Sequence, residues 1–190
     1  MAAAPFWDAK QPVDWTDVEL SQMLADSPWS QTAAGPNPNF PTVQVYLATA
    51  KPVQIAEGER ERRAVAKLKG KAPEFDPFAE EYASWLAENS KDQLILAIRV
   101  GNRKEYSDNA ELDQLEKESV MRVGKKKVSI TGYFPPSSHD PYLRIAFRRP
   151  QLQPSDKEIR FELYLPGVAG PFRTVEFKLD GLMFGGRREF

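Results

Sequence analysis

The sequence predicts an α+β protein with an antiparallel, β-sandwich-like core, about three helices and an N-terminal docking arm. Apolar residues at helical spacing dominate before residue 119, and short alternating segments separated by turns dominate after it. With 41% hydrophobic and 28% charged residues, the composition is that of an ordinary globular chain. We therefore expect a well-packed core.

A single domain over residues 1–190 is expected, because the early strands need partners and no long linker separates the two halves. Within it we distinguish an N-terminal arm and helix (1–30), a mixed α/β part (42–118) and an antiparallel β part (119–190). Residues 30–41 contain three prolines and a glycine and are expected to form a loop.

Local capping signals place the helices. Thr16 and Glu19 have the spacing of a capping box and predict a helix over 17–25. Asp76-Pro77 combines an N-cap with proline at the first helical position and predicts a helix over 77–88, with one buried aromatic-rich face. Two further helices are expected. One, at 53–69, is rich in charged residues and exposed along most of its surface, and the other, at 109–118, is short.

Alternation of apolar and polar residues places the strands. A strand is expected over 42–48, and the most apolar strand, over 93–100, is expected to lie near the centre of the sheet. After residue 119 the segments between turns predict six more strands, at 119–124, 126–134, 141–148, 158–165, 172–179 and 182–189.

Composition excludes several chemistries. The chain has no cysteine, which rules out disulfides, thiolate metal sites and cysteine nucleophiles, and its single histidine rules out a zinc site built from several imidazoles. We expect no metal and no cofactor. The longest apolar run, 94–98, is too short to cross a membrane, and the N-terminus lacks the charged and apolar regions of a signal peptide.

The loop sequence PPSSHDPY raises the question of a catalytic triad, because Ser138, His139 and Asp140 are adjacent. A triad needs the serine and the carboxylate on opposite nitrogens of the imidazole, which consecutive loop residues rarely achieve. A turn before Pro141, with serine hydroxyls bonded to nearby backbone groups, is the favoured interpretation.

The charged clusters are explained by solvent exposure and edge protection. Glu57, Glu59, Glu61 and the pair Glu80-Glu81 are expected on solvated helix faces. The lysines at 125–127 lie at a predicted hairpin, where lysine commonly protects a strand edge from mispairing. The net charge is only −1 and no nucleic-acid-binding signature accompanies the basic clusters, so nucleic acid is not favoured as a partner.

Three of the four tryptophans, Trp7, Trp15 and Trp29, lie in or beside one short amphipathic segment. They form either an exposed ligand platform or an arm docked on the domain. Trp15 and Leu20 have the spacing of a hydrophobic staple, and Trp7 and Trp29 flank the helix where an arm would be fixed at both ends. The docked arm is favoured, because it buries large apolar surfaces.

The order of several short motifs resembles a family of uncharacterised exported proteins of Acidobacteria. The resemblance covers most of the chain and implies an exported protein, in the periplasm or outside the cell, without an assigned activity. It rests on Phe6-Trp7, Trp15-Thr16, Glu19, Met23-Leu24, Ser27-Pro28-Trp29, 135–142, Phe177-Lys178-Leu179 and Leu182-Met183-Phe184.

Taken together, these observations favour a non-enzymatic, exported or envelope-associated module for binding or structure, with a protein or a glycan as its partner. Two alternatives stay open: a carboxylate-based hydrolase acting on carbohydrate, and a peptide or protein binder that uses an open sheet edge. Binding sites concentrate on loops of rigid β scaffolds. The first candidates for ligand contact are therefore Ser137, Ser138, His139 and Asp140, with Arg148 and Arg149 after the following strand.

Overall fold

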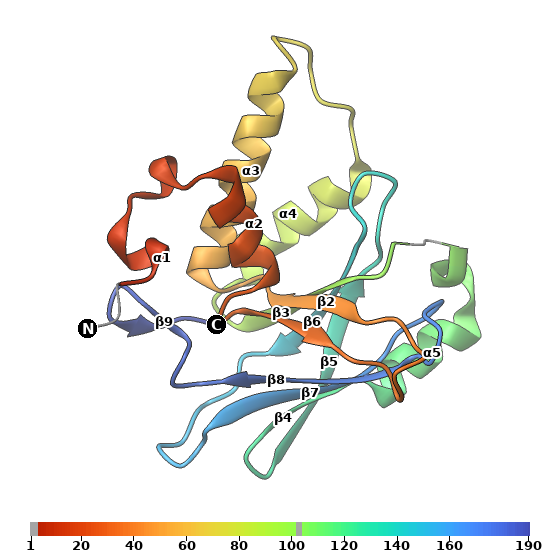
Figure 1. The fold of residues 1–190 in the computed structure, drawn as a ribbon. Helices are drawn as coiled ribbons and strands as arrows, with labels where there is room; N and C mark the ends of the chain where they lie inside the picture. Colours follow the sequence, from red (N-terminus) through yellow and green to blue (C-terminus); the bar gives the residue numbers. More distant parts are fainter. Residues whose placement is uncertain (1–3, 102–103) are drawn as a thin grey trace.

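The computed structural model describes residues 4–101 and 104–190. It is an α+β fold around one antiparallel sheet of eight strands in the order β1-β2-β3-β6-β5-β4-β7-β8 (Figure 1). The two end strands, β1 and β8, lie next to each other, so the sheet is nearly barrel-shaped. Strands from both halves of the sequence are neighbours in this sheet, since β3 pairs with β6.

The described residues form five α-helices rather than about three, together with two short 3-10 turns. None of these helices is long and apolar enough to span a membrane. The helices are α1 Phe6–Ala9, α2 Asp17–Ala25, α3 Lys51–Lys67, α4 Pro77–Asn89 and α5 Asn109–Glu118, and the turns are Pro12–Asp14 and Lys104–Ser107. The strands are β1 Ser30–Ala33, β2 Val43–Leu47, β3 Gln93–Arg99, β4 Val120–Val123, β5 Lys126–Phe134, β6 Tyr142–Arg148, β7 Glu158–Tyr164, β8 Phe172–Lys178, β9 Met183–Phe184 and β10 Arg187–Arg188.

The capping signals identified in the sequence act as expected. Thr16 Oγ1 accepts from the backbone N–H of Glu19 at 3.2 Å, and the Glu19 carboxylate accepts from the N–H of Thr16 at 2.8 Å. The Asp76 side chain accepts from the N–H of Phe78 at 3.0 Å and begins α4. α4 buries its aromatic face only in part, because none of its residues is fully buried.

Three of the predicted segments are corrected. Residues 30–33, expected in a loop, form β1, because their backbone groups pair with the edge of β2, with Thr32 opposite Gln44. α3 begins at Lys51, two residues before the predicted start. The strand expected over 182–189 is a hairpin of two-residue strands, since Gly185 and Gly186 turn the chain with φ of 54° and 76°.

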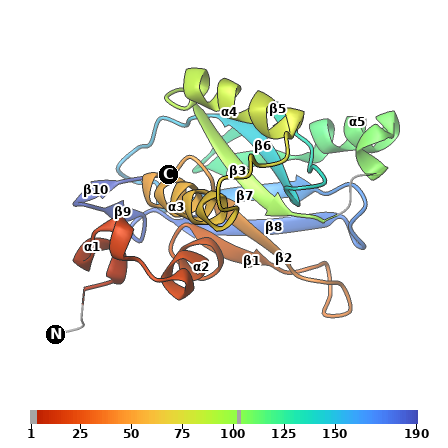
Figure 2. The same cartoon turned by 90° about the horizontal axis from the view of Figure 1, so that it is seen from above.

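The two faces of the sheet have different surroundings. The concave face encloses the core, where the rings of Phe147, Phe161 and Phe177 contact one another across β6, β7 and β8. On the convex face, α3 and α4 lie over β2, β3 and β6 (Figures 1 and 2). α5 contacts β5 and β7, and the alternating burial along β7 and β8 shows that the outer side of these two strands is open to solvent.

The N-terminal arm is docked on the domain. Trp15 is 1% exposed and Trp29 is 0% exposed, and Trp7 is partly buried. Their rings form a continuous edge-to-face series through Phe6, with centroid distances of 5.0–5.6 Å. The indole N–H of Trp29 also donates to the carbonyl of Glu189 at 2.7 Å. The docked-arm prediction is confirmed for Trp15 and Trp29.

Candidate functional site

One row of cross-strand neighbours runs across the helix-covered face of the sheet. Tyr46, Ala97, Arg144 and Phe134 lie directly opposite one another on β2, β3, β6 and β5. Such neighbours project from the same face, so the small side chain of Ala97 leaves space beside the long side chain of Arg144. Arg144 is only 8% exposed, which makes it one of the few buried cations of the described chain.

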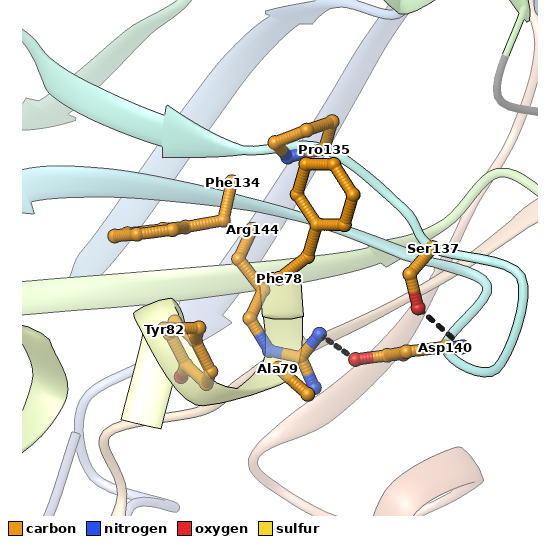
Figure 3. Close-up of a pocket in the computed structure, with 8 residues that line it drawn as sticks. All are labelled: Phe78, Ala79, Tyr82, Phe134, Pro135, Ser137, Asp140 and Arg144. Carbon is orange, nitrogen blue, oxygen red and sulfur yellow. Dashed lines mark hydrogen bonds and ion pairs between the residues drawn. The ribbon is translucent and has the colours of Figure 1, made fainter. Parts of the chain in front are cut away.

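Arg144 is held by groups from three other segments, and a fourth reaches it through Glu57. Its guanidinium forms ion pairs with Asp140 and, at 3.4 Å, with Glu57 of α3. It also lies 4.6 Å from the ring centroid of Tyr82 on α4, and the Tyr46 hydroxyl donates to Glu57 at 2.6 Å. We call these five residues the Arg144 cluster; Figure 3 shows Arg144 pointing between Tyr82 and Asp140.

The loop before β6 is closed by Ser137. Its Oγ donates to the Asp76 carboxylate at the start of α4 and accepts from the backbone N–H groups of His139 and Asp140, at 3.2 and 3.0 Å. The imidazole of His139 lies 3.6 Å from Glu74, whereas the Asp140 carboxylate bonds to Arg144. Residues 138–140 therefore form a turn and not a triad, and Ser138 is exposed.

Electrostatics in the Arg144 cluster reflect burial and mutual pairing. Although 27% of the Glu57 side chain is exposed, burial raises the pKa of its carboxyl group, and Arg144 and the Tyr46 hydroxyl offset this only in part. Burial, followed by the negative charge of Glu57, raises the pKa of Tyr46. Burial alone would lower the pKa of Arg144, but Glu57 and Asp140 outweigh it and the net shift is upward.

Glu57 therefore gives a testable pH dependence. A raised carboxyl pKa means that the folded state holds the proton more tightly than the unfolded chain, so ionisation of Glu57 costs stability as pH rises above its ordinary value of 4.5. Glu57→Gln removes this cost. We expect the stability of the variant relative to the wild type to increase from pH 4.5 to neutral pH, as measured by urea denaturation.

Glu59 on the same helix supplies a control of opposite sign. Its pKa is lowered to about 2 by hydrogen bonds from Arg62 and Arg63, so its contribution to stability is present above 4.5 and is lost as pH falls towards 2. We expect the stability of Glu59→Gln relative to the wild type to decrease as the pH rises from 2 to 4.5. A flat or falling curve for Glu57→Gln would contradict the assignment of Glu57.

The Arg144 cluster connects elements rather than lining a ligand pocket. The cavity beside it, lined by residues including Phe78, Phe134 and Pro135, measures about 10 Å³, which is the space of a single water molecule (Figure 3). Its two acids, Glu57 and Asp140, share one arginine and do not face each other across a cleft that admits a sugar ring. The expectation that Glu57 lies on a solvated helix face is wrong.

Arg148 and Arg149 lie at the opposite end of β6 from Ser137 and Asp140, so the six predicted contact residues do not form one site. Arg149 donates to the carbonyls of Ser90 and Gln93, both at 3.2 Å, and to the carbonyl of Phe190. A cation beside the last carbonyls of a helix is favourable, and Arg149 stabilises the C-terminal end of α4. Arg148 is exposed.

A second candidate site lies on the uncovered half of the convex face. Lys127, Arg122 and Arg160 are directly opposite one another on β5, β4 and β7. Like charges in this position repel and normally destabilise a sheet. We call these three residues the cation row. Edge protection accounts for Lys127 alone, because β6 pairs with β5 only from Ile130 onwards, whereas Arg122 and Arg160 have a paired strand on both sides.

Next to the cation row is an open hollow of about 780 Å³ between two turns. One turn contains Gly124, which has a φ of 54°, and a Cβ atom added there would lie 2.7 Å from the Asp156 carboxylate. Asp156 in turn accepts from the N–H of Gln153 at 2.7 Å and closes the second turn. The two turns therefore touch, which fixes the shape of the hollow. It is lined by 122–126 on one side and by Gln153, 155–158 and Arg160 on the other.

The cations here are only partly neutralised. Glu162 accepts from Nε of Arg122 at 2.9 Å, and Arg160 forms longer ion pairs, at 3.6 Å with Glu176 directly opposite it on β8 and at 3.9 Å with Glu162. In the described part of the chain, Lys157 and the lysines at 125–127 form no ion pair. We call this region the basic face. It has seven cations and four acids, although the whole chain has a net charge of −1. The cations are Arg122, 125–127, Lys157, Arg160 and Lys178, and the acids are Asp156, Glu158, Glu162 and Glu176.

Sequence reasoning found the lysines at 125–127 but not their neighbours. The hairpin around Gly124 already places Arg122 opposite Lys127, whereas Arg160 joins them only through the pairing of β4 with β7. The chain as a whole matches no family model, no curated protein and no solved structure in comparisons with each.

Proposed function

We propose that the protein is a binding module that recognises an anionic partner on the basic face, with the hollow at the centre of the contact. The cation row carries this proposal. Three cations opposite one another on neighbouring strands repel, and a negatively charged partner relieves that repulsion. In the Arg144 cluster both acids lie within 3.4 Å of a buried cation, whereas Arg160 is 3.6 Å and 3.9 Å from Glu176 and Glu162, and Lys127 has no ion pair among the described residues.

The side chains around the hollow suit this role in two ways. Glu162 engages Nε of Arg122 and orients its guanidinium, whose terminal nitrogens bond to no other described residue. A guanidinium held in this way presents two parallel N–H groups to a carboxylate. Lysines without ion-pair partners, such as Lys125 and Lys157, add an attractive field that steers an anion towards the hollow.

A matched pair of triple variants tests the proposal. Lys127→Gln, Arg122→Gln and Arg160→Gln remove the cation row, and Lys67→Gln, Lys69→Gln and Lys71→Gln remove the same charge from the exposed end of α3 and the loop after it. We expect the wild type to bind polyglutamate and carboxymethyl-dextran at low salt. The row variant should bind at least about tenfold more weakly, a change of about 1.4 kcal/mol, measured by isothermal titration calorimetry.

The control variant should stay within about twofold of the wild type, because its charges lie outside the basic face. Equal losses in the two variants would show that binding depends on net charge and not on this surface. Undiminished binding by the row variant would place the site elsewhere and contradict the proposal.

We further propose that the curled sheet acts as a sandwich-like scaffold, with β1, β2, β3 and β6 as one layer and β5, β4, β7 and β8 as the other. The rings of Phe147, Phe161 and Phe177, which meet between these layers, support this division. Export to the periplasm or the cell exterior is supported by the resemblance to exported proteins. Fractionation of cells that make the protein from its own gene tests it, and a purely cytosolic signal would contradict it.

A further inference from the structure

We infer that the anionic partner is an acidic polysaccharide, a chain of sugars that bear carboxylates as well as hydroxyl groups. This inference rests on the proposed function, because it names the partner of the same basic face. Three features of the hollow and its surroundings carry it: its size, its mixture of polar groups and the chemical character of its lining.

The size of the hollow indicates a polymer rather than a small ion. The open hollow of about 780 Å³ far exceeds the volume of a single phosphate or sulfate. Neighbouring strands lie about 4.8 Å apart, so the cation row extends over roughly 10 Å. A chain that carries one negative charge on each repeating unit can meet Lys127, Arg122 and Arg160 in succession.

The hollow also contains groups that disfavour a partner composed of charge alone. Asp156 and Glu158 line it beside the cations, and the uncharged side chains of Gln153 and Ser155 lie on the same side. Carboxylates repel phosphates and other carboxylates, but they accept hydrogen bonds from hydroxyl groups. A sugar acid offers both kinds of group on every unit, whereas polyglutamate and single-stranded DNA carry their charges without hydroxyl groups along the chain.

The lining of the hollow supplies no aromatic platform. Among the described residues that line it, none is Phe, Tyr or Trp, and Val123 is the apolar member. Single-stranded nucleic acids are usually held by stacking of bases on aromatic rings, and neutral sugars also use flat aromatic surfaces. Recognition here depends on charge and hydrogen bonds, which favours an acidic polysaccharide over both.

Calorimetric titration of the full chain with four probes tests the inference. The probes are hexagalacturonate, neutral maltohexaose, hexaglutamate and a single-stranded DNA hexamer. We expect hexagalacturonate to bind at least about tenfold more tightly than hexaglutamate and the DNA, and more weakly as salt is raised from 50 to roughly 200 mM. Maltohexaose should give no measurable heat of binding.

Two sets of variants separate this inference from the proposed function. Gln153→Ala with Ser155→Ala removes exposed side chains that make no described hydrogen bond, so we expect the fold to be retained. We expect this double variant to weaken binding of hexagalacturonate about tenfold and binding of hexaglutamate by no more than about twofold, whereas the row variant weakens both.

The inference of an acidic polysaccharide would be overturned if hexaglutamate or DNA bound as tightly as hexagalacturonate or more tightly, or if maltohexaose bound tightly. The same holds if the double variant binds hexagalacturonate as the wild type does. If hexaglutamate binds through the cation row in these cases, the anion-binding function stands. If no polyanion binds the wild type, both the inference and the proposed function are wrong.

Discussion

Replacing Trp29 by alanine is expected to lower the free energy of unfolding by about 3–5 kcal/mol, the usual cost of truncating a fully buried large aromatic residue. Trp29 is 0% exposed, its ring contacts Trp7, and its indole N–H bonds to the carbonyl of Glu189. In a chain of this length, each kcal/mol lowers the melting temperature by roughly 2–4 °C. Urea denaturation gives the free energy, and calorimetry gives the melting temperature.

Trp85 provides the matched control. It lies half-buried on α4, where its ring contacts Phe134. Trp85→Ala should cost about 1 kcal/mol, the typical value for a point mutant. A chain that begins at Ser30 should melt far lower and bind a dye that reports exposed apolar surface. An unchanged melting temperature of this shortened chain would contradict a stabilising role for the arm.

Replacing Arg144 by leucine is the second change with a large expected effect. The substitution leaves the buried carboxyl group of Glu57 without its cation, and breaking a buried pair in this way typically costs about 3–5 kcal/mol. The loss should be largest at neutral pH. It should shrink in acid, because protonation removes the uncompensated charge of Glu57. Urea denaturation over a range of pH measures both effects.

Arg148 on the same strand tests whether the effect belongs to the cluster. It is exposed, so Arg148→Leu should change the free energy of unfolding by no more than about 0.5 kcal/mol. The double variant Arg144→Leu with Glu57→Gln should recover part of the lost stability. Equal losses for Arg144→Leu and Arg148→Leu, or a loss that grows in acid, would contradict the interpretation of the Arg144 cluster.

The parts of the fold that the sequence predicts well are those set by local chemistry. α2 begins with a capping box and α4 with an N-cap and a proline, and each signal lies within four residues of the bonds that it predicts. β1 was missed because SQTA is short and polar. Its backbone becomes a strand only through β2, which follows about ten residues later.

The same distinction between local and long-range signals applies to the candidate sites. The turn around Ser137 follows from neighbouring residues, and so does the pairing of Arg122 with Lys127 in one hairpin. The role of Glu57 does not, because a glutamate on a charge-rich helix has no local mark of burial. Arg144 reaches it across 87 positions of sequence, and only the placement of α3 over β6 brings the two together.

The bond from Trp29 to Glu189 connects residues 160 positions apart, and this separation affects how the chain folds. Closing so long a loop costs conformational entropy before the stabilising contacts have formed. Docking of the arm is therefore expected to be a late step. During synthesis the tryptophans emerge long before the hairpin of β9 and β10. Until that hairpin forms, their apolar rings lack a final partner and are open to association with other nascent chains.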